Sequence, residues 1–195
     1  MKKGKLLACC AFFLAFSLLL GGCHLLEEDT IYITGIENHS EALSYRSLTD
    51  QLFMPRDFLS TFTYESGNFF YYDRYDIFMK DPLERSLLYL NYDEETYLQA
   101  KEYALQNIFS KEKVTRQYND FVFVDNYNGE KDAEYASEQF TTEISHWFTS
   151  VGYNDQNCCL IFLGFYGSSE EMKVVNGLSW GEFLEHYFSE YYDFG

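Results

Sequence analysis

The sequence predicts an α+β fold: a single domain with a mostly antiparallel sheet of four to six strands and two main helices packed on one face. Apolar runs at 121–124 and 158–165 carry no charge, which is typical of strands buried on both faces. An N-cap residue precedes apolar residues at helical spacing in two places, 94–108 and 179–192. Turn-forming residues at 154–157 separate two strand-like segments and favour an antiparallel hairpin.

Composition indicates a folded, strongly acidic protein. Aromatic residues make up 20% of the 195 residues, and a disordered chain would be poor in them. The formal net charge is −17 at pH 7, which disfavours binding to nucleic acid or to anionic lipid and favours cationic partners. We therefore expect no nucleic-acid partner.

In the first third of the chain, 31–34 reads as a short strand, and a possible helix within 41–60 is interrupted by Pro55. The segment 61–82 holds the densest group of aromatic residues, with aspartates between them. Its alternation predicts one or two strands, with a turn at Ser66-Gly67-Asn68.

Three tyrosines of this segment, Tyr71, Tyr72 and Tyr75, are the candidates for a binding site. Exposed aromatic rings beside carboxylates can stack on sugar rings or hold a cation against the ring faces. The alternative is a strand with two different faces, whose tyrosines cap the core and keep their hydroxyls in water.

The middle of the chain predicts a strand–helix–strand unit. A strand at 86–92 is followed by Asp93, a good N-cap, and by a helix over 94–108 whose apolar residues fall on one stripe. After a charged loop, the apolar segment 121–124 reads as a central strand. We expect a poorly formed helix over 134–145, and then strands at 147–153 and 158–165.

The last helix begins with a capping box formed by Ser179 and Glu182. The surrounding residues 177–181 also match the G-x-S-x-G nucleophile elbow, with a possible strand at 172–175 before them. The only histidine after Ser179 is His186, seven residues along the same helix and about 10 Å away along its axis. We therefore predict a helix cap and assign no catalytic residue.

No cofactor or metal site is expected from the motifs. The four histidines have no metal-ligand spacing, and neither a phosphate-binding loop nor a dinucleotide fingerprint occurs. Residues 125–129 fail the EF-hand spacing, because Tyr127 takes the third position and Gly129 comes one residue early. Cys158 and Cys159 are adjacent, so ordinary disulfide geometry cannot join them, and we predict two thiols on opposite faces of a strand.

The N-terminal segment has the three parts of a secretory signal: a lysine-rich start, an apolar run over 6–20, and small residues. Its ending, Leu20-Gly21-Gly22-Cys23, resembles a bacterial lipobox. The resemblance implies a lipoprotein precursor that is cleaved before Cys23, with lipid of the palmitate type on the Cys23 thiol. The alternatives are an uncleaved membrane anchor, for which 15 residues is short against the roughly 20 needed, and an ordinary signal peptide.

These features divide the chain into a signal peptide (1–22), a lipidated tether (23–40) and a single α+β domain (41–195). Cleavage would remove three lysines and leave 11 Lys and Arg against 31 Asp and Glu, a formal charge of −20. We expect a lipid-anchored protein on the extracytoplasmic face of the cell membrane that binds a protein or glycan without catalysing a reaction. The alternatives are a hydrolase of cell-envelope polymers and an accessory or inhibitory subunit of a membrane complex.

Overall fold

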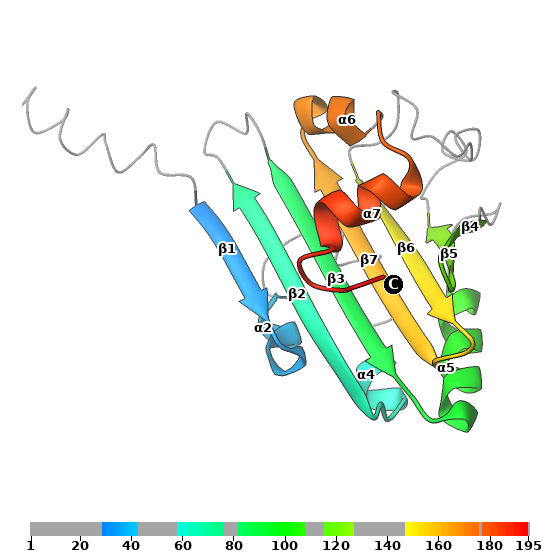
Figure 1. Ribbon diagram of the computed structural model, residues 1–195. Helices are drawn as coiled ribbons and strands as arrows, with labels where there is room; N and C mark the ends of the chain where they lie inside the picture. The colour runs from blue at the N-terminus through cyan, green and yellow to red at the C-terminus, as the bar shows by residue number, and fades with distance from the viewer. Residues whose placement is uncertain are drawn as a thin grey trace, which may run out of the picture.

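The computed structural model describes residues 29–42, 58–75, 82–107, 115–126, 147–175 and 177–194. In this part of the chain, one open antiparallel sheet has the strand order β1-β2-β3-β7-β6-β5-β4 (Figure 1). Its seven strands are β1 (Asp29–Thr34), β2 (Ser66–Tyr75), β3 (Leu83–Asn91), β4 (Thr115–Tyr118), β5 (Phe121–Asn126), β6 (Trp147–Asn154) and β7 (Cys159–Gly167). The α+β class with an antiparallel sheet is confirmed.

Seven strands exceed the four to six that we expected, because β4 has a weak sequence signal and the short strand predicted at 31–34 was assigned to the tether and not to the sheet. We placed β1 in the tether, yet it pairs along its whole length with β2, from Asp29 opposite Tyr75 to Thr34 opposite Phe70. Part of the range 23–40 therefore belongs to the sheet. Strand β4 is polar and falls at the end of the expected charged loop, so no hydrophobic alternation reveals it.

Two longer helices cover opposite faces of the sheet, and not one face as expected. Helix α5 (Glu94–Gln106) packs on the face that Leu160 and Phe162 of β7 share with Val124. Helix α7 (Trp180–Phe188) lies on the other face, against alternate residues of β7. Since β7 is apolar on both faces, each face needs a cover of its own.

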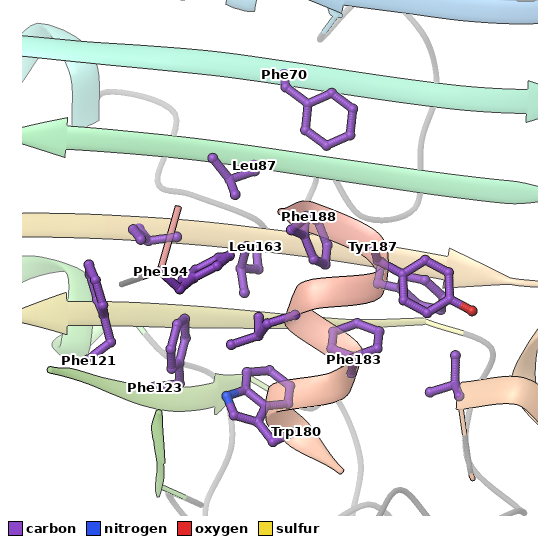
Figure 2. Packing of buried hydrophobic residues seen from close by; sticks show 14 of the residues in the cluster. Phe70, Leu87, Phe121, Phe123, Leu163, Trp180, Phe183, Tyr187, Phe188 and Phe194 are labelled. Atoms are coloured by element: carbon purple, nitrogen blue, oxygen red, sulfur yellow. The ribbon is translucent and has the colours of Figure 1, made fainter. Parts of the chain in front are cut away.

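Figure 2 shows the core on the α7 face, where aromatic residues of the helix and the C-terminal segment meet those of the strands. Phe165 and Phe183 make an edge-to-face contact with ring centroids 5.2 Å apart, a geometry that aromatic pairs favour. Trp180 and Phe183 stack at 5.4 Å. The largest fully buried side chains are Phe70, Phe123, Phe165, Phe183 and Phe188 on the α7 face, and Phe58, Phe69, Tyr71, Tyr97 and Phe162 on the α5 face.

Both predicted helix starts are confirmed. The Asp93 carboxylate accepts a hydrogen bond from the Thr96 amide at 3.0 Å and so caps α5. At α7, the Ser179 hydroxyl accepts from the Glu182 amide, and the Glu182 carboxylate accepts from the Ser179 amide at 2.8 Å. Ser179 is therefore a helix cap, as predicted.

Two local predictions were wrong. Ser66-Gly67-Asn68 begins strand β2, and a Cβ at Gly67 would lie 2.7 Å from the Tyr89 carbonyl oxygen. The glycine permits close approach of a neighbouring strand and does not make a turn. Residues 172–175 belong to helix α6 (Ser169–Val175), whose buried Met172 and Val175 are three residues apart, at helical spacing.

The hairpin between β6 and β7 is confirmed, with Asn154 opposite Cys159. The Asn154 side chain accepts hydrogen bonds from the amides of Gln156 and Asn157 at 2.9 and 3.0 Å, which fixes the turn. The described part of the chain also contains three short helical segments: η2 (Ile36–Asn38), α2 (His39–Ala42) and α4 (Phe58–Thr61).

Several predictions fall outside the described residues. They are the signal peptide with Cys23, the possible helix around Pro55, and the expected helix over 134–145. Within the described ranges, no helix is long and apolar enough to cross a membrane.

Candidate functional site

The three candidate tyrosines do not form one exposed platform in the structure. Tyr71 is fully buried, at 0% exposure, and belongs to the core on the α5 face. Tyr72 is half-buried and packs on the α7 face, because successive residues of a strand point to opposite faces. The side chain of Tyr75 lies outside the described part of the molecule.

Tyr72 instead helps to hold helix α7 on the sheet. The Arg85 guanidinium lies 4.5 Å from the centroid of the Tyr72 ring, within the range of a cation–π contact. Arg85 also donates a hydrogen bond to the Tyr187 carbonyl in the last turn of α7 at 2.8 Å. A cation at this end of a helix is favourable, so the Tyr72–Arg85 pair has a structural role.

The two edges of the open sheet differ, and the β1 edge has the features of a binding site. Strand β1 has six residues, and among the described residues no strand pairs with its outer side (Figure 1). Its sequence, DTIYIT, is β-branched or aromatic at five of six positions and contains no lysine, proline or glycine. Such an edge can accept a further strand.

The ladder decides which backbone groups of β1 point outward. The Gly35 amide donates to the Phe69 carbonyl of β2 at 2.8 Å. Because hydrogen-bonded positions alternate along an antiparallel pair, the backbone groups of Ile33 and Ile31 also point toward β2. Thr30, Tyr32 and Thr34 consequently direct their backbone groups away from β2. The Thr34 carbonyl accepts from the Asn38 side chain at 2.8 Å, and no strand in the described part of the chain pairs with the other outward groups.

Aromatic rings flank this edge on the α7 face. Tyr32 is 54% exposed, and its ring lies 6.1 Å from that of Tyr191. Tyr191 in turn stacks on the buried Phe70 with centroids 3.4 Å apart. Burial, followed by a hydrogen bond with Tyr32, raises the pKa of Tyr191, so its hydroxyl stays protonated at neutral pH. The result is a small aromatic surface beside an open strand edge.

The opposite edge strand, β4, carries a buried charged side chain. Strand β4 has four residues, and Arg116 points inward, with its Nε 2.6 Å from Oδ2 of Asp125. The Ser150 hydroxyl donates to Oδ1 of Asp125 at 3.0 Å, and the Arg116 guanidinium lies 5.2 Å from the Trp180 ring centroid. An inward charge on an edge strand opposes pairing with another chain.

Helix α7 and the C-terminal segment also cover β4. The Tyr118 hydroxyl donates to the Glu185 carboxylate at 2.5 Å, and the Asn119 side chain donates to the Phe194 carbonyl at 2.9 Å. A Cβ at Gly181 would lie 2.5 Å from the Tyr118 ring, so this glycine allows the helix to approach the strand. Strand β4 is therefore held against helix α7 and the C-terminal segment by several contacts.

A pair of carboxylates occupies the α5 face near the start of β1. Asp73 of β2 lies directly opposite Glu84 of β3, and Glu84 is only 7% exposed. Burial raises the pKa of Asp73, and the Tyr71 hydroxyl acts in the opposite direction. The buried Ser86 hydroxyl lies on the same face, with no hydrogen-bond partner among the residues that the structure describes.

No group of three or more His, Cys, Asp or Glu residues in the described ranges is placed to hold a metal ion. Asp73 and Glu84 supply two carboxylates, whereas calcium sites use six to eight oxygen ligands. Two opposed carboxyls, one with a raised pKa, have the chemistry needed to exchange a proton.

The two cysteines are free thiols that pack toward opposite faces, as predicted, but only Cys159 lies in a strand. Cys159 is buried on the α7 face, and Cys158, in the turn before β7, packs toward the α5 face. Burial raises the pKa of Cys159 to about 11, so this thiol is a poor nucleophile at neutral pH.

Sequence reasoning singled out the tyrosines of β2 and missed the edge beside them. The signal was present, because residues 30–34 are all β-branched or aromatic and include no lysine or proline that would block pairing. The segment begins six residues after Cys23, within the range 23–40 that was assigned to a tether, and so it was not considered as part of the sheet. Comparison of the chain with family models, with curated proteins and with solved structures finds no match.

Proposed function

We propose that this protein is a lipid-anchored interaction module on the extracytoplasmic face of a bacterial membrane, and that it binds a partner polypeptide at the β1 edge. One observation carries the proposal: the open edge strand begins only six residues after the cysteine of the lipobox-like motif. A binding edge and an anchor that are close in the sequence favour a partner close to the membrane.

The length of the connection limits the distance. Six residues span at most about 20 Å when fully extended, so the start of β1 would lie within about 20 Å of the lipidated Cys23. Two acyl chains on one cysteine give stable anchoring, whereas a single chain exchanges. The end of the sheet that contains Asp29 would then face the bilayer, with the β1 edge beside it.

Charge supports a protein partner over the lipid itself. The mature chain would carry a formal charge of −20, which an anionic membrane surface repels. The lipid would therefore fix the position of the domain without drawing its surface onto the bilayer. A cationic partner near the membrane would be attracted.

Labelling of intact cells tests the anchor. Cells grown with an alkyne analogue of palmitate should label the wild-type protein and not Cys23→Ser. Labelling of Cys23→Ser to the wild-type level, or retention of residues 1–22 in the mass spectrum of the wild-type protein, would show that the anchor is wrong.

Photo-cross-linking tests the binding edge in the same cells. A photoreactive amino acid at position 32, on the open edge, should give a discrete adduct with another polypeptide. The same amino acid at Gln117, which is exposed on β4, is the matched control and should give none. Equal adducts from both positions, or none from position 32, would contradict a function at β1. An integral membrane protein in the adduct would identify the module as an accessory subunit.

A hydrolase of cell-envelope polymers is the second candidate, and the Asp73–Glu84 pair favours it. Two adjacent carboxyls, one with a raised pKa, can provide a general acid and a general base. Isolated cell wall incubated with the protein should then release reducing ends, and Asp73→Asn should abolish the release. No release by the wild-type protein between pH 4 and 8 would exclude this activity.

A further inference from the structure

We infer that the β1 edge takes up an extended, basic polypeptide segment as an eighth strand of the sheet. This inference rests on the proposed function and gives the partner a chemistry: a strand with lysine or arginine on one face and apolar residues on the other. Three features carry it: the backbone groups of β1 that point away from β2 and have no strand partner among the described residues, the acidic residues beside β1, and the different side chains on its two faces.

The backbone of β1 provides the main-chain bonds. By the alternation of the ladder, the amides of Thr30, Tyr32 and Thr34 and the carbonyls of Thr30 and Tyr32 point away from β2. An added strand can bond to these groups as β2 bonds to the inner side. Main-chain bonds of this kind provide affinity in strand addition, while side chains provide specificity.

The acidic residues near β1 favour a basic partner segment. Exposed Glu37 and Glu41 follow β1 directly, and Asp73 lies beside Ile31 on the neighbouring strand. Association with a second copy would bring together two chains that each carry a formal charge of −17, and the repulsion between them opposes association. A basic segment gains from the same field, so the partner strand is basic and is not a second copy.

The two faces of β1 distinguish alternate residues of the partner. On the α7 face, an added side chain would lie beside the exposed Tyr32 ring, which favours apolar or aromatic contact. On the α5 face it would lie beside Ile31, with Asp73 one strand further in. Strands are about 4.8 Å apart, so Asp73 lies about 10 Å from the added backbone, and a lysine extended over Ile31 approaches it.

A designed peptide tests the inference in solution. The probe is a fluorescein-labelled peptide of eight residues, Lys and Val in alternation, titrated with the protein carrying Cys23→Ser, followed by fluorescence anisotropy. We expect saturable 1:1 binding. Two control peptides keep the length and alternation: one has Glu in place of Lys, and the other carries N-methyl groups on the alternate amides that would face β1. Both should bind at least tenfold more weakly.

Matched variants locate the binding. Tyr32→Pro removes an outward amide and the ring, whereas Tyr32→Ala removes the ring alone, so the proline variant should bind at least tenfold more weakly than the alanine variant. Asp73→Asn should weaken the Lys peptide several-fold and leave the Glu peptide unchanged. Circular dichroism of each variant confirms that the sheet is intact, and Thr30→Pro replaces Tyr32→Pro if that variant is unfolded.

The outcomes separate the inference from the proposed function. Equal binding of the N-methylated and unmodified peptides, or of Tyr32→Pro and Tyr32→Ala, overturns strand addition. Dimerisation of the unliganded protein that Tyr32→Pro abolishes, measured by sedimentation, assigns the edge to a second copy and overturns the basic partner. If either occurs while position 32 still cross-links to another polypeptide in cells, the proposed function stands and only the partner chemistry is wrong.

Discussion

The two edge strands of the sheet, β1 and β4, are built in opposite ways. Strand β4 is four residues long, points Arg116 into the core, and lies under helix α7 and the C-terminal segment. Strand β1 is longer, contains only β-branched and aromatic residues after Asp29, and has an aromatic flank on one face. Within the ranges that the structure describes, one edge of the same sheet is thus protected against pairing, and no strand covers the other.

The difference indicates that availability at β1 is not a general property of this open sheet. An unprotected edge is a risk for aggregation, and β4 combines several of the known means of protection. Residues that would protect β1, such as a lysine or a proline, are absent from it. An edge left open beside a proposed membrane anchor is consistent with a binding role there.

The largest expected effect is on the protected edge. Arg116→Ala leaves Asp125, at 0% exposure, without this counter-charge, and the expected loss in the free energy of unfolding is about 3–5 kcal/mol. Arg74→Ala is the control, because Arg74 and Glu171 are 3.8 Å apart and partly exposed, and its loss should stay under about 1 kcal/mol. Urea unfolding measures both, and similar losses would show that the buried pair does not hold β4.

Proline substitution along β1 tests the assignment of its inward and outward amides. Ile31→Pro removes an inward amide and leaves a carbonyl of β2 without its partner, which costs about 1–3 kcal/mol. Tyr32→Pro removes an outward amide together with the ring, and Tyr32→Ala removes the ring alone. The free energies of unfolding of these two variants should therefore differ by under about 1 kcal/mol. Thermal unfolding compares the variants. The reverse order would mean that the outer side of β1 is not the side assigned here.

Weakening helix α7, which packs against β4, should lower the stability of the protein by a smaller amount. Ser179→Ala removes the N-cap of α7, the helix whose Trp180 lies beside Arg116, and should lower stability by about 1 kcal/mol. Ser179→Asp keeps an acceptor at the cap and should retain most of the stability. Because the hydroxyl caps a helix and is not a nucleophile, a serine-directed fluorophosphonate should not label the wild-type protein, and labelling would contradict the cap as its only role.

The smallest effect is a difference in pH dependence between two aspartates. The pKa of Asp73 is raised by burial, so its contribution to stability is present below its unfolded pKa, near 3.8, and is lost as pH rises through the folded value. The pKa of Asp155 is lowered by Lys101 and Tyr97, so its contribution is present above about 3.8 and is lost as pH falls through the folded value.

Asparagine variants measure this difference. At pH 7, Asp73→Asn should unfold at a slightly higher urea concentration than the wild-type protein, because the variant buries no charge. Asp155→Asn should unfold at a slightly lower one, by under about 1 kcal/mol because Asp155 is mostly exposed. Below pH 3, both differences should shrink. A loss of stability in Asp73→Asn at pH 7 would contradict the raised pKa.

The sequence by itself determined the elements with strong local signals. The caps at Asp93 and Ser179 were predicted because a cap involves residues only three positions apart, and the hairpin at 154–157 because its turn residues stand between two strand-like segments. Strand β7 was predicted because it is apolar at nearly every position. The division into helix and strand followed from these short-range patterns.

Only the tertiary structure decided which elements are neighbours. Hydrophobic periodicity shows that a helix has a buried stripe, but it does not show which face of the sheet the helix covers. The expectation that α5 and α7 pack on the same face was therefore wrong. The sequence predicts a strand at 31–34 but not that it joins the sheet, and it does not predict β4, because membership in the sheet depends on backbone pairing with distant strands. The candidate binding edge exists because the sheet ends at β1, and where a sheet ends is a property of the whole assembly of strands.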